Sequence, residues 1–461
     1  MSDKETPSIP DVKSKTVEFE KIVKHYLDSN PVMTIGNKTS ELEIRFGTNP
    51  RVSKPITKID YDNVVKQLYD CGFVSDNIKG VQMLRVQNEY TDTRTGQKRM
   101  SNIRAEINGT DMIQEYCSTN SIQRLIDMPS TTLNKLNFTQ KNSALAANGE
   151  YIRRMDMEDY NFRVSFQTEQ IFHMRTSVAN NIISKWNDSL KIFRCMNRVR
   201  FRHPSMPVFV DMSVVKMSKK VKYVPVPKYT IQESGVFLGN EQYEIELEVD
   251  NSRVGDGTEY NNVKSLMNML RKSIRIIMSG IQGTKYPITY SMKNDILYNY
   301  MKLVHGEKYE PKSRILPRDF TGPSSFTLQL ENIIEQDEDN KQPNIRNDYT
   351  VTDKADGERK LLYIASDGKI YMIDTNMNVI FTGSKTNEKT IFDSLIDGEH
   401  IKYDKNGNYI QLYAAFDVYY IHTKNTREFP FVPTNDDETE TKCRLPLLHK
   451  LVELIKPRSI M

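Results

Sequence analysis

The chain is poor in the residues that mark several protein classes. Its 461 residues include one Trp, four Cys and 20 Gly. So little glycine excludes a collagen-like triple helix, and so few cysteines exclude a disulfide-rich scaffold. No stretch approaches the run of about 20 apolar residues that a membrane-spanning helix needs. The first residues, MSDKETPSIPDVKSK, are polar, so no secretory signal peptide is expected there.

The chain also lacks a metal-binding cysteine pattern and an excess of one charge. Cys71, Cys117, Cys195 and Cys443 lie far apart and form no CxxC pair, which predicts free, buried thiols in a reducing compartment. The 64 basic and 60 acidic residues leave a net charge of +4. Any electrostatic site must therefore come from local sorting of charge.

The apolar content is sufficient for folded domains. Hydrophobic residues make up 38% of the chain and aromatic residues 9%, which excludes a wholly disordered protein. Composition and periodicity predict four segments. They are a disordered lead with a first helix (1–34), a β-rich domain ending in helices (35–305), a connector (306–347) and a second β-rich domain (348–461).

Between 41 and 250 the sequence mostly alternates with the period of β-strands. The alternating segments are ELEIRFG, NFRVSFQTEQ, NRVRFRHP, VFVDMSVVK and YEIELEVD. Apolar residues recur at three and four positions over 17–27, 260–279 and 295–304, and the end of the chain, KCRLPLLHKLVELIK, has the same character. These four stretches are predicted to be helices.

The polar faces of the strands carry charges that are sorted by sign. Glutamates alternate over 41–43 and 244–248, whereas arginines alternate over 198–202. Like charges at i and i+2 repel, so an ordinary solvent face would mix the signs. Clustered carboxylates suit Mg²⁺ or Mn²⁺, and rows of arginine suit phosphate oxygens. The pattern favours a metal-bound polyphosphate site in a charged barrel, with plain solvated faces as the alternative.

ELEIRFG and YEIELE resemble the two glutamate motifs of the triphosphate tunnel metalloenzymes, with FRVSFQTE, RVRFR and FVDMSVV between them in the family's order. The set is similar to the RNA triphosphatase branch found in fungal, poxviral and giant-virus capping enzymes. The resemblance implies an α+β fold whose first domain is an eight-stranded antiparallel β tunnel with packing helices. It implies metal-dependent removal of the γ-phosphate from 5′-triphosphate RNA.

The same resemblance implies a set of site residues. The metal ligands would be Glu41, Glu43, Glu244 and Glu246, the catalytic residues Arg163, Arg198, Arg200 and Asp211, and the further substrate-binding residues Lys141 and Arg202. The arginines would neutralise the triphosphate. Asp211 would orient them or position the attacking water. The sequence leaves open which of the arginines at 198, 200 and 202 face the tunnel.

A lysine motif begins the second β-rich domain. TDKADGERKL places Lys354 before Asp356, Gly357 and Arg359, and SLIDGEHI and YAAFDVYYI follow in order. A KxDG tetrapeptide alone also occurs in surface turns. Here β-like residues at 349–351 and 361–364 flank it, which favours a lysine presented at a strand end.

The three motifs in this order resemble the covalent nucleotidyltransferase superfamily of capping guanylyltransferases and polynucleotide ligases. The resemblance implies a mixed β-sheet domain in which Lys354 is the nucleophile and GTP the substrate. Asp356, Gly357, Arg359, Glu399 and Phe416 would bind the nucleotide, with Phe416 stacking on the base. The family's later motifs do not follow, so this domain is expected to be truncated.

Together the two resemblances predict a viral-type mRNA capping enzyme with triphosphatase and guanylyltransferase halves. Its implied partners are triphosphate-ended RNA, GTP, Mg²⁺ or Mn²⁺ and other capping or transcription subunits, with no membrane. Its implied location is the cytoplasm, a viral factory or a virion. Two alternatives remain: a polyphosphatase tunnel fused to an ATP-dependent ligase-like module, and a non-enzymatic RNA-binding or subunit scaffold.

Overall fold

The computed structural model describes residues 12–34, 36–48, 55–92, 94–128, 135–310, 315–335, 342–347, 349–433 and 442–459. The predicted disordered lead before residue 12 and most of the acidic loop near 340 lie outside the described residues. The chain divides into two compact units, residues 1–283 and 284–461. Each unit is described by itself.

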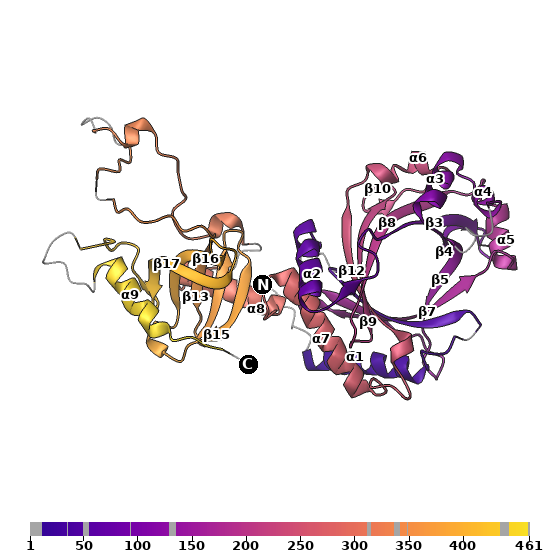
Figure 1. Cartoon of the computed structure of the whole chain (residues 1–461), viewed down its shortest axis with the longest axis horizontal. Coiled ribbons are helices and arrows are strands. Elements are labelled where there is room, and N and C mark those ends of the chain that lie inside the picture. Colours follow the sequence, from indigo (N-terminus) through magenta and orange to yellow (C-terminus); the bar gives the residue numbers. More distant parts are fainter. Residues whose placement is uncertain are drawn as a thin grey trace, which may run out of the picture. The chain divides into compact units, whose positions relative to one another are not determined.

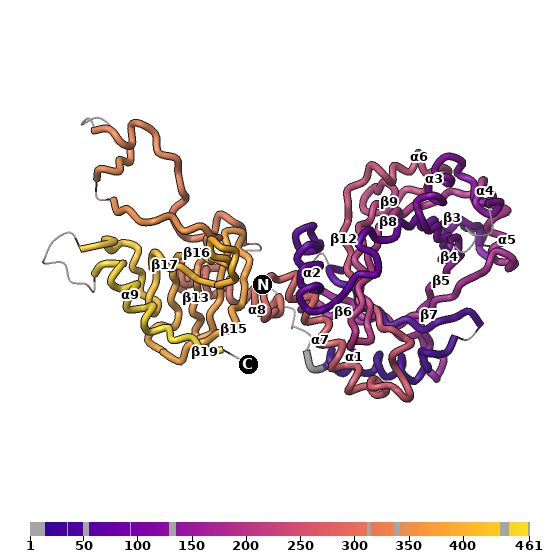
Figure 2. The backbone as a smooth tube through the Cα atoms, viewed as in Figure 1, coloured from indigo at the N-terminus to yellow at the C-terminus, as the bar shows by residue number. Residues whose placement is uncertain are grey.

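The first unit is built on a closed antiparallel barrel (Figures 1 and 2). Eight strands follow one another around it in the order β1-β12-β9-β8-β3-β4-β5-β7, and β7 pairs with β1 to close the ring. The strands are β1 (Lys38–Phe46), β3 (Val81–Thr91), β4 (Lys98–Asn108), β5 (Leu136–Ser143), β7 (Phe162–Phe172), β8 (Lys191–Arg202), β9 (Val208–Met217) and β12 (Gln242–Val249). This confirms the predicted eight-stranded tunnel.

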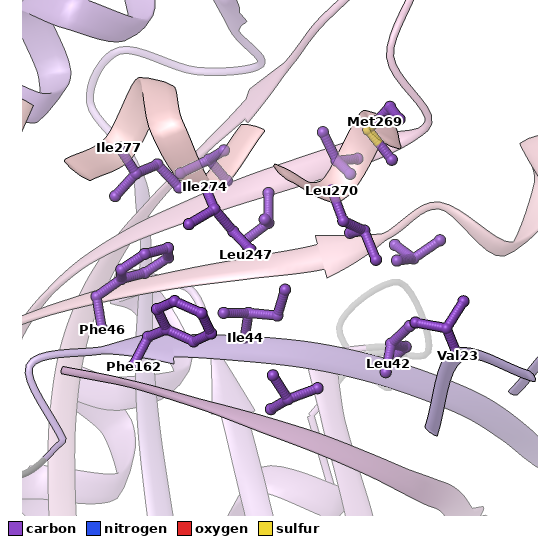
Figure 3. Close-up of a cluster of buried hydrophobic side chains, with 14 of the residues drawn as sticks. Val23, Leu42, Ile44, Phe46, Phe162, Leu247, Met269, Leu270, Ile274 and Ile277 are labelled. Atoms are coloured by element: carbon purple, nitrogen blue, oxygen red, sulfur yellow. The ribbon is translucent and has the colours of Figure 1, made fainter. Parts of the chain in front are cut away.

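Apolar side chains cover the outside of this barrel. Figure 3 shows Leu42, Ile44 and Leu247 of the barrel beneath Leu270 and Ile274 of helix α7 (Val263–Gln282). Helices α1 (Val12–Asp28) and α2 (Lys58–Asp70) pack in the same layer. Burying one such aliphatic side chain is worth about 1.5–3 kcal/mol. Because side chains alternate across a strand, an apolar outer face turns the polar residues inward.

A close helix crossing fixes this outer layer. A Cβ on Gly280 of α7 would lie 2.7 Å from the Cα of Val64 in α2. Only glycine allows the two helices to approach so closely there.

A second apolar cluster covers another part of the barrel wall and contains the single tryptophan, Trp186. Its helices are α3 (Thr110–Thr119), α4 (Ile122–Ile126), α5 (Ser177–Ser184) and α6 (Ile231–Ser234). The remaining short strands of this unit are β2 (Val74–Ser75), β6 (Met155–Met157), β10 (Lys220–Val221) and β11 (Val224–Pro225).

The second unit is a seven-stranded sheet between two helices. Its order is β18-β17-β16-β13-β14-β15-β19. The strands are β13 (Glu358–Ile364), β14 (Lys369–Asp374), β15 (Val379–Lys385), β16 (Ser394–Tyr403), β17 (Tyr409–Ile421), β18 (Lys424–Asn425) and β19 (Arg458–Ser459). One face packs on α8 (Tyr290–His305) and the other on α9 (Arg444–Ile455).

Three expectations differ from this arrangement. The helix near 295–304 was expected in the first domain, but Ile296 and Tyr300 of α8 pack with Leu361 in the second unit. The second sheet was expected to be mixed, whereas all pairings among its described strands are antiparallel. Residues 349–351 were expected to be β-like, yet they form no strand.

All four cysteines lie in the described residues, and none of them forms a disulfide, as predicted. Cys443 is buried, and the other three cysteines are half-buried. Within the described residues, no helix is both long and apolar enough to cross a bilayer.

Candidate active sites in the barrel and the second unit

The barrel interior gathers most of the charged residues that the sequence predicted. The register pairs Glu43 with Glu248 and Arg45 with Glu246 between β1 and β12. It also pairs Arg200 with Asp211 between β8 and β9. Directly opposed residues share a face of the sheet, so these side chains all lie on the inner face.

Carboxylates surround two inward-facing cations. The Arg45 guanidinium lies 3.4 Å from Glu43, 3.6 Å from Glu244 and 3.1 Å from Glu246. Lys141 forms an ion pair with Glu41 and lies 3.7 Å from Glu43. The four predicted glutamates therefore lie in one region of the barrel, where they surround the positive side chains of Arg45 and Lys141.

The glutamates of this region have pKa values that are shifted in opposite directions. Burial and then Glu246 raise the pKa of Glu43 to about 7. Burial also opposes the charge on Glu246, but Arg198 and Arg45 outweigh it and lower its pKa to about 2. Burial and Glu41 raise the pKa of Glu248 to about 7. Glu43 and Glu248 therefore keep a proton to higher pH than an exposed carboxyl does, chiefly because they are buried.

A cavity of about 320 Å³ lies beside these glutamates. Its charged lining residues are Arg45, Arg85, Arg104, Lys141, Arg194, Arg198, Glu43 and Glu246, six basic against two acidic. Among the described residues, two buried arginine nitrogens have no hydrogen-bond acceptor, Nη2 of Arg104 and Nε of Arg194, whereas Nε of Arg85 lies 2.8 Å from Glu106. Burial lowers the pKa of Arg85 to about 10 even though Glu106 opposes the shift. Orphaned donors around a cationic cavity fit a polyanionic ligand.

The remaining predicted arginines lie at different places along the barrel. Arg198 lines the cavity, and Arg200 donates two hydrogen bonds of 2.7 Å to the buried Asp211. Asp211 also lies 2.9 Å from Arg198, so it holds both arginines in place. Arg202 is half-exposed and pairs with Asp76. Arg163 pairs with Asp156 and lines an adjoining cavity.

The donor set inside the barrel fits a divalent cation. Within the described residues, no three His, Cys, Asp or Glu side chains are already grouped as metal ligands. Yet the buried Oε2 of Glu41 has no hydrogen-bond partner there, and burial and then the neighbouring Glu246 raise the pKa of Glu43. Carboxylate oxygens are the ligands that Mg²⁺ and Mn²⁺ prefer.

In the second unit, the lysine motif lies just before β13. The Lys354 side chain is 86% exposed and lies 3.8 Å from Asp356. A Cβ on Gly357 would lie 2.9 Å from the carbonyl oxygen of His400, so only glycine lets this turn pack against β16.

Arg359 is engaged by the sheet itself. It donates a fork of 3.1 and 2.6 Å to Asp397, which is fully buried and also accepts a hydrogen bond from Tyr419. Glu399 is the strand partner of Arg359, and its buried Oε2 has no hydrogen-bond partner among the described residues. Phe416 on β17 is 37% exposed, so its ring is accessible.

Sequence reasoning missed several cavity residues. Arg45, Arg85, Arg104 and Arg194 were not among the predicted site residues. The period-two alternation places all four on the inner faces of β1, β3, β4 and β8, but it does not by itself distinguish them from residues of a solvated face.

Comparisons with known proteins agree with the sequence resemblance. Residues 315–435 match the family "mRNA capping enzyme, catalytic domain". This range contains TDKADGERKL, SLIDGEHI and YAAFDVYYI. A "Probable mRNA-capping enzyme" of Acanthamoeba polyphaga mimivirus is 30% identical over 176 residues, which are 38% of this chain. The chain spans only a small part of that relative, 12% of its length.

Two solved structures are similar to parts of the chain. A mimivirus capping enzyme triphosphatase is 13% identical with a TM-score of 0.36, covering 58% of this chain and 97% of that one. An RNA triphosphatase of S. pombe is 15% identical with a TM-score of 0.30, covering 59% and 94%. The sequence matches confirm the predicted capping-enzyme resemblance, since residues 315–435 match the catalytic-domain family of mRNA capping enzymes.

Proposed function

We propose that the chain acts in mRNA capping. Its barrel hydrolyses the γ-phosphate of 5′-triphosphate RNA with the help of Mg²⁺ or Mn²⁺. Its second unit contributes Lys354 to the transfer of GMP from GTP onto the resulting diphosphate end. The observation that carries the first activity is the cavity with six basic lining residues, two of which, Arg104 and Arg194, have a buried nitrogen without a hydrogen-bond partner among the described residues.

In the first reaction, water attacks the γ-phosphorus and the bond to the β,γ-bridging oxygen breaks. Inorganic phosphate and diphosphate-ended RNA are the products. Arg104 and Arg194 each have a buried N–H group without an acceptor among the described residues, which could bind the phosphate oxygens, and Arg85 adds positive charge beside them. Such fixed donors stabilise the charge that develops on the leaving diphosphate without reorganising.

Glu41, Glu43, Glu244 and Glu246 are the side chains that would hold the metal. When bound, a divalent cation neutralises phosphate charge and polarises the γ-phosphorus. Asp211 positions Arg198 and Arg200 through the bonds that it accepts. Its role here is to orient the arginines, the first of the two alternatives that the sequence left open.

The test is release of labelled phosphate from RNA that carries γ-labelled triphosphate, with metal and with chelator. Wild-type protein should release phosphate only with metal, and Glu43→Ala or Glu246→Ala should abolish release. Glu18→Ala, which removes an exposed carboxylate on α1, is the matched control and should keep full activity. Metal-dependent release by either active-site variant at the wild-type rate would refute the assignment.

In the second reaction, the neutral amine of Lys354 attacks the α-phosphorus of GTP. A phosphoramidate bond forms and pyrophosphate leaves. Glu399, with its unsatisfied buried oxygen, is suited to a sugar hydroxyl or a metal, and Phe416 to stacking on the base. Arg359 would act mainly by holding Asp397 and the strand that follows the lysine.

Labelling with α-labelled GTP tests this half. In a longer form of the protein that contains the family's later motifs, an acid-labile, base-stable label should form on Lys354 and disappear in Lys354→Ala. Lys405→Ala, at an exposed turn, is the control. Labelling that survives Lys354→Ala would place the nucleophile elsewhere. Labelling by ATP and not GTP would favour the ligase-like alternative.

A further inference from the structure

A second cavity adjoins the first at one end of the barrel. Its volume is about 500 Å³, and Glu43, Arg45 and Gln167 line both cavities. Ser143, which ends β5, and Arg163, near the start of β7, lie in its wall. The second cavity therefore leads from the cationic cavity to the barrel end at which β5 stops and β7 begins.

A short hairpin, residues 144–152, stands at this end. Its two sides are joined by hydrogen bonds from Ile152 N to Ala144 O (2.9 Å) and from Ala146 N to Glu150 O (2.8 Å). The hairpin is thus held together by its own backbone hydrogen bonds, and it continues directly from β5. Leu145 and Tyr151 face each other across it and are 56% and 71% exposed.

Two arginines follow the hairpin and line the second cavity. Arg153 and Arg154 are both exposed, and neither forms an ion pair with a carboxylate of the described residues. Arg163, in contrast, is held by Asp156. The cavity has four arginines and one glutamate among its lining residues, with Ile152 and Phe166 supplying apolar surface.

This combination matches the chemistry of a single nucleic-acid strand. Free arginines bind backbone phosphates, and exposed aromatic and aliphatic side chains receive unstacked bases without regard to sequence. A simple inorganic or nucleoside triphosphate would fill the first cavity and leave these groups unused.

We propose that Arg153, Arg154 and Tyr151 form a subsite for the RNA chain that follows the 5′-triphosphate. The inference rests on the proposed triphosphatase function and deepens it. The first cavity binds the triphosphate, which ATP and RNA share, whereas the hairpin subsite binds only the strand. The barrel therefore prefers triphosphate-ended RNA to free nucleotides.

The test compares two substrates in the full chain: ATP, and a triphosphate-ended RNA of about ten nucleotides, a length within the range of single-strand sites. In Arg153→Glu/Arg154→Glu, the ratio of kcat/KM for RNA to kcat/KM for ATP should fall by at least about tenfold, because attraction becomes repulsion. Tyr151→Ala should lower the same ratio by a smaller factor. Arg271→Glu/Lys272→Glu, on exposed positions of α7, makes the same change of net charge and should leave the ratio as in wild type.

Salt dependence gives an independent readout. The logarithmic slope of RNA affinity against salt should become shallower by about 0.7 for each phosphate that Arg153→Ala/Arg154→Ala no longer binds. A ratio within about twofold of wild type together with an unchanged slope would overturn the subsite. That outcome would also follow if the hairpin bound an acidic protein segment. If wild-type protein hydrolyses neither ATP nor RNA, the triphosphatase assignment itself fails.

Discussion

Replacing Glu43 by glutamine should change how the stability of the metal-free barrel depends on pH. Burial and Glu246 raise the pKa of Glu43 from 4.5 to about 7 in the folded protein. Between these values the folded protein keeps a proton that the unfolded chain releases. The free energy of unfolding therefore falls as pH rises from about 4.5 to about 7, and stays at its lower value above that window.

The size of the effect follows from the two pKa values. Their separation corresponds to about 3 kcal/mol that ionised Glu43 costs the fold at high pH. Glutamine has the same shape and no charge, so Glu43→Gln escapes this loss. The quantity to compare is the free energy of unfolding of the variant minus that of wild type. This difference should be about 3 kcal/mol larger at pH about 8 than at pH about 5. Glu248 titrates over the same window but is present in both proteins, so its contribution largely cancels.

Urea unfolding with chelator present measures this directly. Trp186 is the single tryptophan and is buried in the barrel unit, so its fluorescence reports the unfolding of that unit alone. Glu18→Gln, on an exposed position of α1, is the control and should track wild type at every pH. A Glu43→Gln stability difference that does not vary between the two pH values would refute the reasoning.

Three further variants test the structure. Asp211→Asn removes the buried anion between Arg198 and Arg200, so the free energy of unfolding should fall by about 3–5 kcal/mol in the same assay, and a loss near zero would contradict the buried pairing. Arg200→Lys keeps the charge but loses the fork to Asp211, so kcat for phosphate release should fall by at least about tenfold; wild-type kinetics would show that this fork does not serve turnover. Gly280→Ala forces a Cβ against Val64 and should cost about 1–3 kcal/mol, whereas an unchanged unfolding midpoint would mean that α2 shifts freely.

The barrel could be predicted because residues on the two faces of a strand alternate along the sequence. Where one face is apolar and the other charged, the pattern shows which residues pack under the helices and which face the interior. In β1 and β12 the apolar residues pack under α7 and the glutamates face inward, as the alternation required. The inner arginines of β3 and β4 were missed because their faces mix signs. Arg85 is followed by Gln87, and Arg104 by Glu106, so these strands look like ordinary solvated faces.

Contacts between elements that are far apart in the sequence were harder to predict. The periodicity of α8 predicts a buried face but not which sheet covers it, and the helix packs in the second unit rather than on the barrel. In the same way, ADGER identifies Arg359 as a motif residue, but only the register of β13 and β16 brings it against the buried Asp397.

The central claim is that the inward-facing glutamates hold a catalytic divalent cation beside a triphosphate. The most direct measurement is the anomalous scattering of Mn²⁺ in crystals of the protein grown with Mn²⁺ and a non-hydrolysable triphosphate. The account predicts a peak inside the barrel bonded to carboxylate oxygens of Glu43 and Glu246, with the phosphates among Arg85, Arg104 and Arg194. Mn²⁺ bound only outside the barrel, with the interior arginines and glutamates still paired to one another, would contradict it.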